Sequence, residues 1–482
     1  MSSLTKRAVI LIACRVMNYG VLILSPIFLV RIFDMRSFGQ YREFMLYALL
    51  SSTLILFSIP SNLLYFVSKY RNKESQSVTN TILFAFIASI VGSALIYAFK
   101  DFIVAKTSFD FILPLIAYTL LAVNFDIFEP FWLAKKRTDY VLYYSASRIF
   151  IRTAAIIVTS YATRDVFSAI YSLIFVEAFR IFVVFFLFRG HLRLPLDKAL
   201  MKEQLSFVAP LGLAYTLNTV NTQLANLTIS IKMGAERLAL YSVGSHQMPI
   251  INIIRSSVMD VLFPEMTQAT NDTSRLLLWK KANVIFCFLV FPVYVLFISF
   301  AATVIELLFT AQYLAAVPLF RIYGTLMLIQ SFEMGTPLRS INKNRYFILG
   351  SILTLAANLG FIISFFSIVG FVTPGIANIL GELVALFYLG SVITRLYGIN
   401  IRKLFMWNKI ALIAISCIIA MPCLALRYIL MLPEIAEAAI LSLAYLAIYL
   451  IIVKLFHIEE TERLLSKLLN LIKLMGKRSE RM

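Results

Sequence analysis

Residues 31–41, with the sequence Arg-Ile-Phe-Asp-Met-Arg-Ser-Phe-Gly-Gln-Tyr, form a short polar segment between two apolar stretches. A similar segment, Lys-Met-Gly-Ala-Glu-Arg-Leu-Ala-Leu-Tyr, occupies residues 232–241. In both copies an apolar run ends at a basic residue, a methionine follows, and a tyrosine opens the next apolar run. This similarity between the two segments predicts a chain built from two repeated halves.

A second pair of motifs supports the same division. Phe128-Glu129 and Phe332-Glu333 each lie inside an apolar segment that ends in a basic cluster, Lys135-Lys136-Arg137 and Lys343-Asn344-Arg345 respectively. Repeated halves that each carry a carboxylate at a similar place are typical of a transporter whose site lies between the halves.

The composition requires a membrane environment. Of the 482 residues, 60% are hydrophobic and only 14% are charged, and the mean hydropathy is +0.86, which leaves too little polar surface for a soluble globule. Because about 20 apolar residues span a bilayer as a helix, the sequence predicts an all-α integral membrane protein with about fourteen spans, namely residues 8–32, 44–67, 79–99, 111–134, 141–162, 166–188, 205–231, 238–263, 283–305, 314–338, 346–369, 373–394, 408–431 and 435–456.

The loop charges predict the orientation of these spans. The even-numbered loops carry twenty Lys and Arg residues and the odd-numbered loops carry nine. Since basic loops stay on the cytoplasmic side, both termini are expected in the cytoplasm. The same asymmetry accounts for the net charge of +19 without a nucleic-acid partner.

The repeats predict four regions. Residues 1–200 and 201–400 would form two six-helix bundles. Residues 401–456 would add a pair of transmembrane helices, because these spans hold no ionisable group in their interiors. Residues 457–482 have the pattern of a basic amphipathic tail that lies along the inner leaflet.

The short loops hold no nucleotide-binding motif, and we expect neither an enzyme nor a metal site. ATP is therefore not expected to drive transport directly, and coupling to an H⁺ or Na⁺ gradient is a hypothesis.

Arginines inside the spans are the first candidates for a binding site, because a charge in mid-membrane needs a partner or a ligand. Arg148 and Arg152 are four residues apart, so both face one side of a helix and could bind a diphosphate. The alternative is that they form salt bridges with Asp126 or Glu129 of the preceding span. Arg15 has no carboxylate near it in sequence, and Arg255 is a further candidate.

Carboxylates inside the spans are candidates for ion coupling or gating. Glu129 and Glu333, together with Asp126, could take up and release a proton as access alternates; the alternative is a gate salt bridge to a basic loop. Glu382 follows Gly381, where helices can approach closely, and its alternative is a helix contact.

The seventh predicted span carries an unusual run of amides, which could hydrogen-bond a hydroxyl-rich glycan inside a cavity. The alternative is amide bonding between helices, which explains one or two of the four residues better than all of them. These residues are Asn218, Asn221, Gln223 and Asn226.

The chain resembles the polysaccharide-transporter branch of the multidrug/oligosaccharidyl-lipid/polysaccharide (MOP) exporters, which includes flippases of the O-antigen type. The resemblance rests on the predicted topology, on the motifs Phe38-Gly39-Gln40-Tyr41 and Leu238-Ala239-Leu240-Tyr241, read as turns, on the continuation Tyr241-Ser242-Val243, and on Pro264. The second motif lacks the glycine that the family often shows at this place.

This resemblance implies movement of an undecaprenyl-diphosphate-linked oligosaccharide, such as the O-antigen unit of a lipopolysaccharide, across the bacterial cytoplasmic (inner) membrane. It implies two bundles around a central cavity, with arginines 15, 148, 152 and 255 on the diphosphate and the amides on the glycan. Membrane lipids, a polysaccharide polymerase and a chain-length regulator would be its partners.

Three alternatives stay open. A multidrug cation antiporter has a similar architecture, but the spans here hold as many arginines as carboxylates, which favours an anionic substrate. A lipid II flippase would use the same carrier lipid. A scaffold or receptor that transports nothing would not explain the repeated carboxylates.

Overall fold

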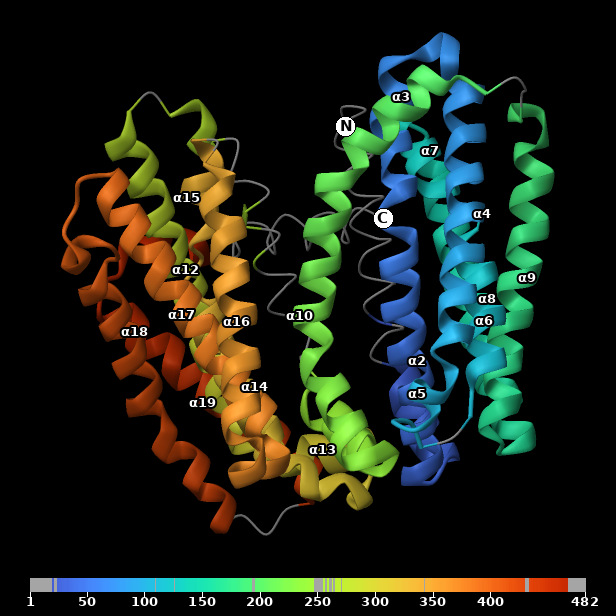
Figure 1. Ribbon diagram of the computed structural model, residues 1–482. Coiled ribbons are helices and arrows are strands. Elements are labelled where there is room, and N and C mark those ends of the chain that lie inside the picture. Colours follow the sequence, from blue (N-terminus) through green and yellow to red (C-terminus); the bar gives the residue numbers. More distant parts are fainter. Residues whose placement is uncertain are drawn as a thin grey trace, which may run out of the picture. The chain divides into compact units, whose positions relative to one another are not determined.

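The computed structural model describes residues 20, 24–108, 110–124, 126–192, 196–246, 255, 258–259, 262, 265–269, 271–341, 343–429 and 433–466, and these are helical with short connections (Figure 1). The α-helices are α2 (Met35–Leu56), α3 (Asn62–Lys69), α4 (Glu74–Ala98), α5 (Lys100–Val104), α6 (Ile112–Val123), α7 (Phe128–Ala134), α8 (Thr138–Thr163), α9 (Val166–Phe188), α10 (Lys198–Gly244), α12 (Asp272–Ser299), α13 (Ala301–Phe309), α14 (Val317–Gln330), α15 (Gly335–Ser340), α16 (Asn344–Val369), α17 (Thr373–Leu396), α18 (Trp407–Ala420) and α19 (Glu434–Leu455).

Within the described residues nine helices are long and apolar enough to cross a membrane, or ten if the bent pair α2 and α3 counts as one span. One of the nine, Arg345–Leu396, comprises both α16 and α17. Large apolar side chains on α8 and α9 are exposed, including Phe150 and Phe175, as expected for helices that face lipid. The all-α membrane fold is confirmed, and most of the first predicted span and half of the eighth lie outside the described residues.

The motif that opens the sequence analysis forms the start of a helix and not a turn. Asp34 accepts a hydrogen bond from the backbone N–H of Ser37 at 2.9 Å and caps α2, which begins at Met35 and therefore earlier than residue 44. The hydrogen bonds from Ser37 hold the pKa of the Asp34 carboxyl below its ordinary value. The segment Phe38–Tyr41 is helical as a result.

The second copy of the motif is helical as well. α10 continues through residues 232–241 with a kink at Gly234, whose φ of 79° suits glycine. Gly39 of the first copy packs directly on Ala235 of the second copy, because a Cβ at Gly39 would lie 2.0 Å from the carbonyl oxygen of Ala235. The glycine therefore serves close helix packing, and the expected turns are absent from these two described segments.

The described residues divide into two compact units, Met1–Val243 and Gly244–Met482, whereas the sequence analysis places a boundary between residues 200 and 201. The difference arises because α10 is bonded to the first unit along its length. Near its start the buried Gln204 side chain donates to Asn62 Oδ1 at 2.9 Å, and near its end Ser230 donates to Glu43. α10 therefore completes the first unit.

Two of the predicted spans are broken at or next to their Phe-Glu motif. The span predicted over residues 111–134 consists of α6 and α7, which are separated by residues 124–127. The span predicted over residues 314–338 consists of α14 and α15, which are separated by residues 331–334. Each unit thus contains, within its described residues, a discontinuous helix whose break lies at or next to the Phe-Glu motif.

Candidate functional site

Broken membrane helices expose backbone groups that other residues must satisfy, and for this reason they mark binding sites in transporters. In the first unit three carbonyl groups at the end of α6 are satisfied by one side chain, Arg180 of α9, which is 5% exposed. Its Nη2 donates to the carbonyl oxygens of Leu121, Ala122 and Asn124 at 2.8, 3.1 and 3.0 Å. A cation at a helix C-terminus also matches the helix dipole.

Glu177 joins this arginine to a second one. Its carboxylate accepts from Arg180 Nε and lies 3.6 Å from Arg148 Nη2 of α8. Arg148 also donates to Asp126, inside the break, at 3.3 Å. Glu177 and Arg180 thus form a local ion pair three residues apart on α9, and Arg148 forms the salt bridge with Asp126 that was the alternative to anion binding.

Arg152 lies one turn further along α8 on the same face, and its side chain is partly buried. Within the described part of the first unit no carboxylate approaches its guanidinium to 4.0 Å, although Glu177 is within electrostatic range. The arginine pair therefore consists of one guanidinium that is held by two carboxylates and one that is available to an anion.

Glu129 occupies the first turn of α7, just after the break. The hydroxyl of Ser145 donates to its Oε1 at 2.7 Å. No basic side chain among the described residues lies within 4.0 Å of this carboxylate, so the salt bridge of the alternative reading is not formed with them.

In the second unit the break is satisfied by a carboxylate. Glu333 is 4% exposed, and its side chain accepts from the backbone N–H groups of Gly335 at 2.8 Å and of Thr336 at 3.0 Å, which start α15. The backbone of Glu333 is held by Asn283, which accepts its N–H at 2.9 Å, and by Trp279, which donates to its carbonyl at 2.6 Å. Glu333 thus acts as an N-terminal helix cap.

Arg255 and Glu382 lie near this cap. Arg255 Nη2 is 4.0 Å from Glu333 Oε1, and Glu382 of α17 is within electrostatic range of Arg255. Among the described residues Glu382 forms no salt bridge within 4.0 Å, and its side chain is partly buried. The second unit therefore holds one arginine between two carboxylates.

The amides of α10 divide into two sets. Asn226 donates to Gln223 at 2.9 Å within α10 itself, so these two satisfy each other in part, whereas the alternative expects amide bonds between helices. Asn218 is exposed and Asn221 is partly buried. Arg15 lies outside the described residues, so its place in the fold stays a prediction.

The sequence analysis missed Glu43 of α2, which is 0% exposed. Its carboxylate accepts from the hydroxyl of Ser230 of α10 at 2.6 Å and from the backbone N–H of Ser108 at 2.9 Å. The Ser108 hydroxyl in turn accepts from the N–H of Ala235 at 2.8 Å. A signal was present in the sequence, since Glu43 directly precedes an apolar run, but its serine partners are distant in the chain.

We expect Glu43→Ala to lower the free energy of unfolding by about 2–3 kcal/mol, because it leaves the Ser230 hydroxyl and the Ser108 N–H buried without an acceptor. Glu43→Gln keeps an acceptor oxygen, so its free energy of unfolding should fall by less than half as much. Thermal unfolding of the detergent-purified protein measures both effects. Glu236→Ala, an exposed glutamate beyond the kink of α10, is the control, and equal losses for Glu43→Ala and Glu236→Ala would contradict the expectation.

Residues 28–318 match the model of the protein family described as "Polysaccharide biosynthesis protein". No curated protein matches the sequence.

Solved structures share the fold. The structure titled "Lipid II flippase MurJ, inward closed conformation" aligns with a TM-score of 0.75 and 13% identity over 92% of this chain and 99% of its own. A mutant of the Vibrio cholerae MATE transporter VcmN aligns with a TM-score of 0.55 and 13% identity over 83% of this chain and 99% of its own. A MOP superfamily transporter from Pyrococcus furiosus gives a TM-score of 0.54 and 13% identity over 83% of this chain and 96% of its own.

Proposed function

The chain belongs to the polysaccharide biosynthesis protein family, and we propose that it is a flippase for an undecaprenyl-diphosphate-linked oligosaccharide. The cargo would be the repeat unit of an O-antigen or of a similar surface polysaccharide. The protein would carry it across the bacterial cytoplasmic membrane by alternating access, with both of its own termini in the cytoplasm. The MOP-type fold, which it shares with transporters, supports this function over an enzymatic one.

The observation that carries the proposal is the arrangement of Arg148 and Arg152. Arg148 is fixed by Asp126 and Glu177, so its charge is largely neutralised and its position is set. Arg152 lies one turn away inside a membrane helix and forms no ion pair within 4.0 Å among the described residues, and a charge at such a place costs free energy unless a ligand satisfies it. A diphosphate supplies the negative charge that would balance Arg152, and arginine binds phosphate oxygens through two parallel hydrogen bonds.

Arg15 and Arg255 complete the proposed diphosphate contacts. Arg255 is already shared with Glu333, so a diphosphate would compete there with a carboxylate. The amides Asn218, Asn221, Gln223 and Asn226 of α10 would bind the glycan. A polysaccharide polymerase and a chain-length regulator would take up the cargo on the far side of the membrane.

An H⁺ or Na⁺ gradient is the proposed driving force, through Asp126, Glu129, Glu333 or Glu382. The contacts favour Glu129 and Glu382, since no basic group in the described ranges lies within 4.0 Å of either carboxylate. Asp126 is paired with Arg148, and Glu333 accepts a backbone hydrogen bond at the start of α15.

We expect Arg152→Ala to lower export of the surface glycan about 10-fold or more, because one charge-assisted contact with the diphosphate contributes roughly 1.5–3 kcal/mol. The gene is deleted in its host, and the surface glycan is analysed on a gel after complementation with each variant. Arg152→Lys keeps the charge and should recover part of the export. Thermal unfolding should be unchanged, since Arg152 forms no ion pair within the described structure.

The proposal fails if the deletion leaves the surface glycan unchanged. Normal glycan export by Arg152→Ala at wild-type protein levels would remove this residue from the diphosphate site. A lipid II flippase is the second candidate, favoured by the TM-score of 0.75 to MurJ. Arrest of growth on deletion, with loss of cell-wall synthesis, would decide for that alternative.

A further inference from the structure

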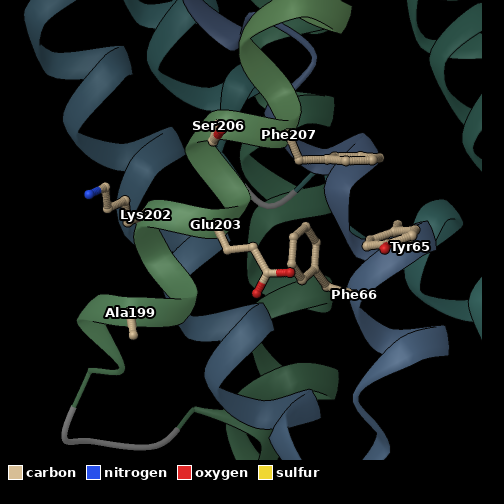
Figure 2. A pocket seen from close by; sticks show the side chains of 7 residues that line it. All are labelled: Tyr65, Phe66, Ala199, Lys202, Glu203, Ser206 and Phe207. Atoms are coloured by element: carbon tan, nitrogen blue, oxygen red, sulfur yellow. The ribbon is translucent and has the colours of Figure 1, made fainter.

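A pocket of about 540 Å³ lies within the first unit at the start of α10, next to α3 (Figure 2). The first turns of α10 line it with small residues at Ala199 and Ser206 and with charged residues at Lys202 and Glu203. α3 supplies aromatic side chains, and Phe207 of α10 adds a third ring. The complete lining is Tyr65, Phe66, Ala199, Lys202, Glu203, Ser206 and Phe207.

The aromatic wall is fixed by ring contacts. Tyr65 and Phe207 stack with their centroids 4.8 Å apart, and Phe66 meets Phe207 edge to face at 5.6 Å. Tyr65 is 41% exposed although it is a large ring on a packed helix. The wall therefore offers a preformed apolar face without further loss of side-chain freedom on binding.

The polar side of the pocket holds Glu203, which is paired with Lys69, and a second lysine, Lys202. Glu203 accepts from Tyr70 Oη at 3.1 Å and from Lys69 Nζ at 3.2 Å, and Lys69 also lies over the ring of Tyr65 at 5.1 Å. A carboxylate has acceptor sites for about four hydrogen bonds, so Glu203 retains capacity for a ligand. Figure 2 shows Glu203 directed toward Phe66 and Lys202 extending from another side of the helix.

This combination fits a sugar better than a phosphate. A phosphate would meet the carboxylate of Glu203, which would repel it, while Lys69 is already paired with this carboxylate and Lys202 extends away from it (Figure 2). A sugar ring can place its apolar C–H face on the aromatic wall while its hydroxyl groups donate to Glu203 and bond with Ser206. The volume suits one or two sugar rings within the pocket size typical of small ligands.

The spacing on α10 connects the pocket with the predicted glycan contacts. At 3.6 residues per turn, positions 203, 207, 218 and 221 fall within about 60° of one another around the helix. Gln223 and Asn226 fall on the opposite side. Asn218 and Asn221 thus continue the face that carries Glu203 and Phe207.

We infer that this pocket is a sugar-binding subsite, which receives a ring of the lipid-linked oligosaccharide at the end of α10 that the basic loops place in the cytoplasm. The inference rests on the proposed flippase function and deepens it. It assigns glycan recognition to Tyr65, Glu203 and Phe207, which the sequence analysis does not single out.

The test compares binding of two lipids to the full-length purified protein: the lipid-linked oligosaccharide extracted from the deletion strain, and undecaprenyl diphosphate. The wild-type protein should prefer the glycosylated lipid. We expect Phe207→Ala to reduce this preference about 3- to 10-fold and Glu203→Gln to reduce it about 10-fold. Binding of undecaprenyl diphosphate should stay unchanged in both variants.

Lys198→Gln and Leu205→Ala are the matched controls, since both residues are exposed on α10 and lie outside the pocket. Thermal unfolding identifies a variant that fails to fold, and Ser206→Ala then serves as a milder change of the same pocket. Pocket variants that keep the full preference for the glycosylated lipid would overturn the inference while leaving the flippase function intact. A wild-type protein that binds neither lipid would instead contradict the proposed function itself.

Discussion

Replacement of Arg180 by methionine should destabilise the protein by about 3–5 kcal/mol, the largest effect that we expect from a single substitution. The change removes the donor to three carbonyl groups at the end of α6 and leaves Glu177 with Arg148 alone. Loss of one partner of a buried ion pair leaves an uncompensated charge, which costs this amount in proteins. Thermal or denaturant unfolding in detergent measures the loss.

A double variant separates the two parts of this effect. Arg180→Met combined with Glu177→Gln removes both charges, so the cost of the unpaired carboxylate disappears while the α6 carbonyl groups stay unsatisfied. We expect the double variant to recover a large part of the stability. Arg36→Met is the control, because Arg36 is exposed on α2. An Arg180→Met protein that unfolds like the wild type would show that the break in this span does not depend on the guanidinium.

Replacement of Glu333 by alanine should lower the free energy of unfolding by about 2–3 kcal/mol through its effect on the second unit. Two backbone N–H groups at the start of α15 lose their acceptor, and the loss of a helix cap together with buried unsatisfied donors has this size. Glu333→Gln keeps one acceptor oxygen for these groups and should lose about half as much.

The same variants separate a structural role of Glu333 from ion coupling. If the carboxylate acts only as a cap, export should fall in proportion to the loss of folded protein, and Glu333→Gln should export nearly as well as the wild type. A stable Glu333→Gln protein without export would instead assign Glu333 to coupling. Glu382→Gln is the control for stability, since no hydrogen bond holds this side chain within the described ranges.

The two helix breaks show opposite solutions to one physical problem. A break creates free carbonyl groups on one side and free N–H groups on the other, and the membrane offers no water to satisfy them. The first unit satisfies the carbonyl groups with a guanidinium from α9, whereas the second unit satisfies the N–H groups with the carboxylate next to the break. The charges near each break are therefore partly structural, and among the described residues this structural role leaves Arg152, Glu129 and Glu382 available.

Much of the fold could be predicted from the sequence, because span length and the basic loops depend on local composition. Apolar runs and loop charges locate most of the spans, and the spacing of Arg148 and Arg152 places them on one face of α8. The local pair of Glu177 and Arg180 could also be predicted, since residues three apart on a helix are neighbours.

The sequence could not show which polar groups meet across distant segments. The cap of α2 at Asp34 extends that helix over a motif that has the composition of a turn. The partners of Glu43 lie on α10 and on the segment between α5 and α6, and the carbonyl groups held by Arg180 lie on α6. Such contacts follow from packing and not from local pattern, so hydropathy alone gives no sign of them.

Translocation in reconstituted vesicles tests the central claim most directly. Purified wild-type and Arg152→Ala proteins are placed in separate liposomes that contain the lipid-linked oligosaccharide extracted from the deletion strain, and a glycosidase outside the vesicles reports which glycans have reached the outer leaflet. The account predicts rapid exposure of the inner-leaflet glycan with the wild-type protein. With the folded Arg152→Ala protein the rate of exposure should fall about 10-fold or more. Wild-type vesicles that expose the glycan no faster than protein-free vesicles would contradict the flippase function.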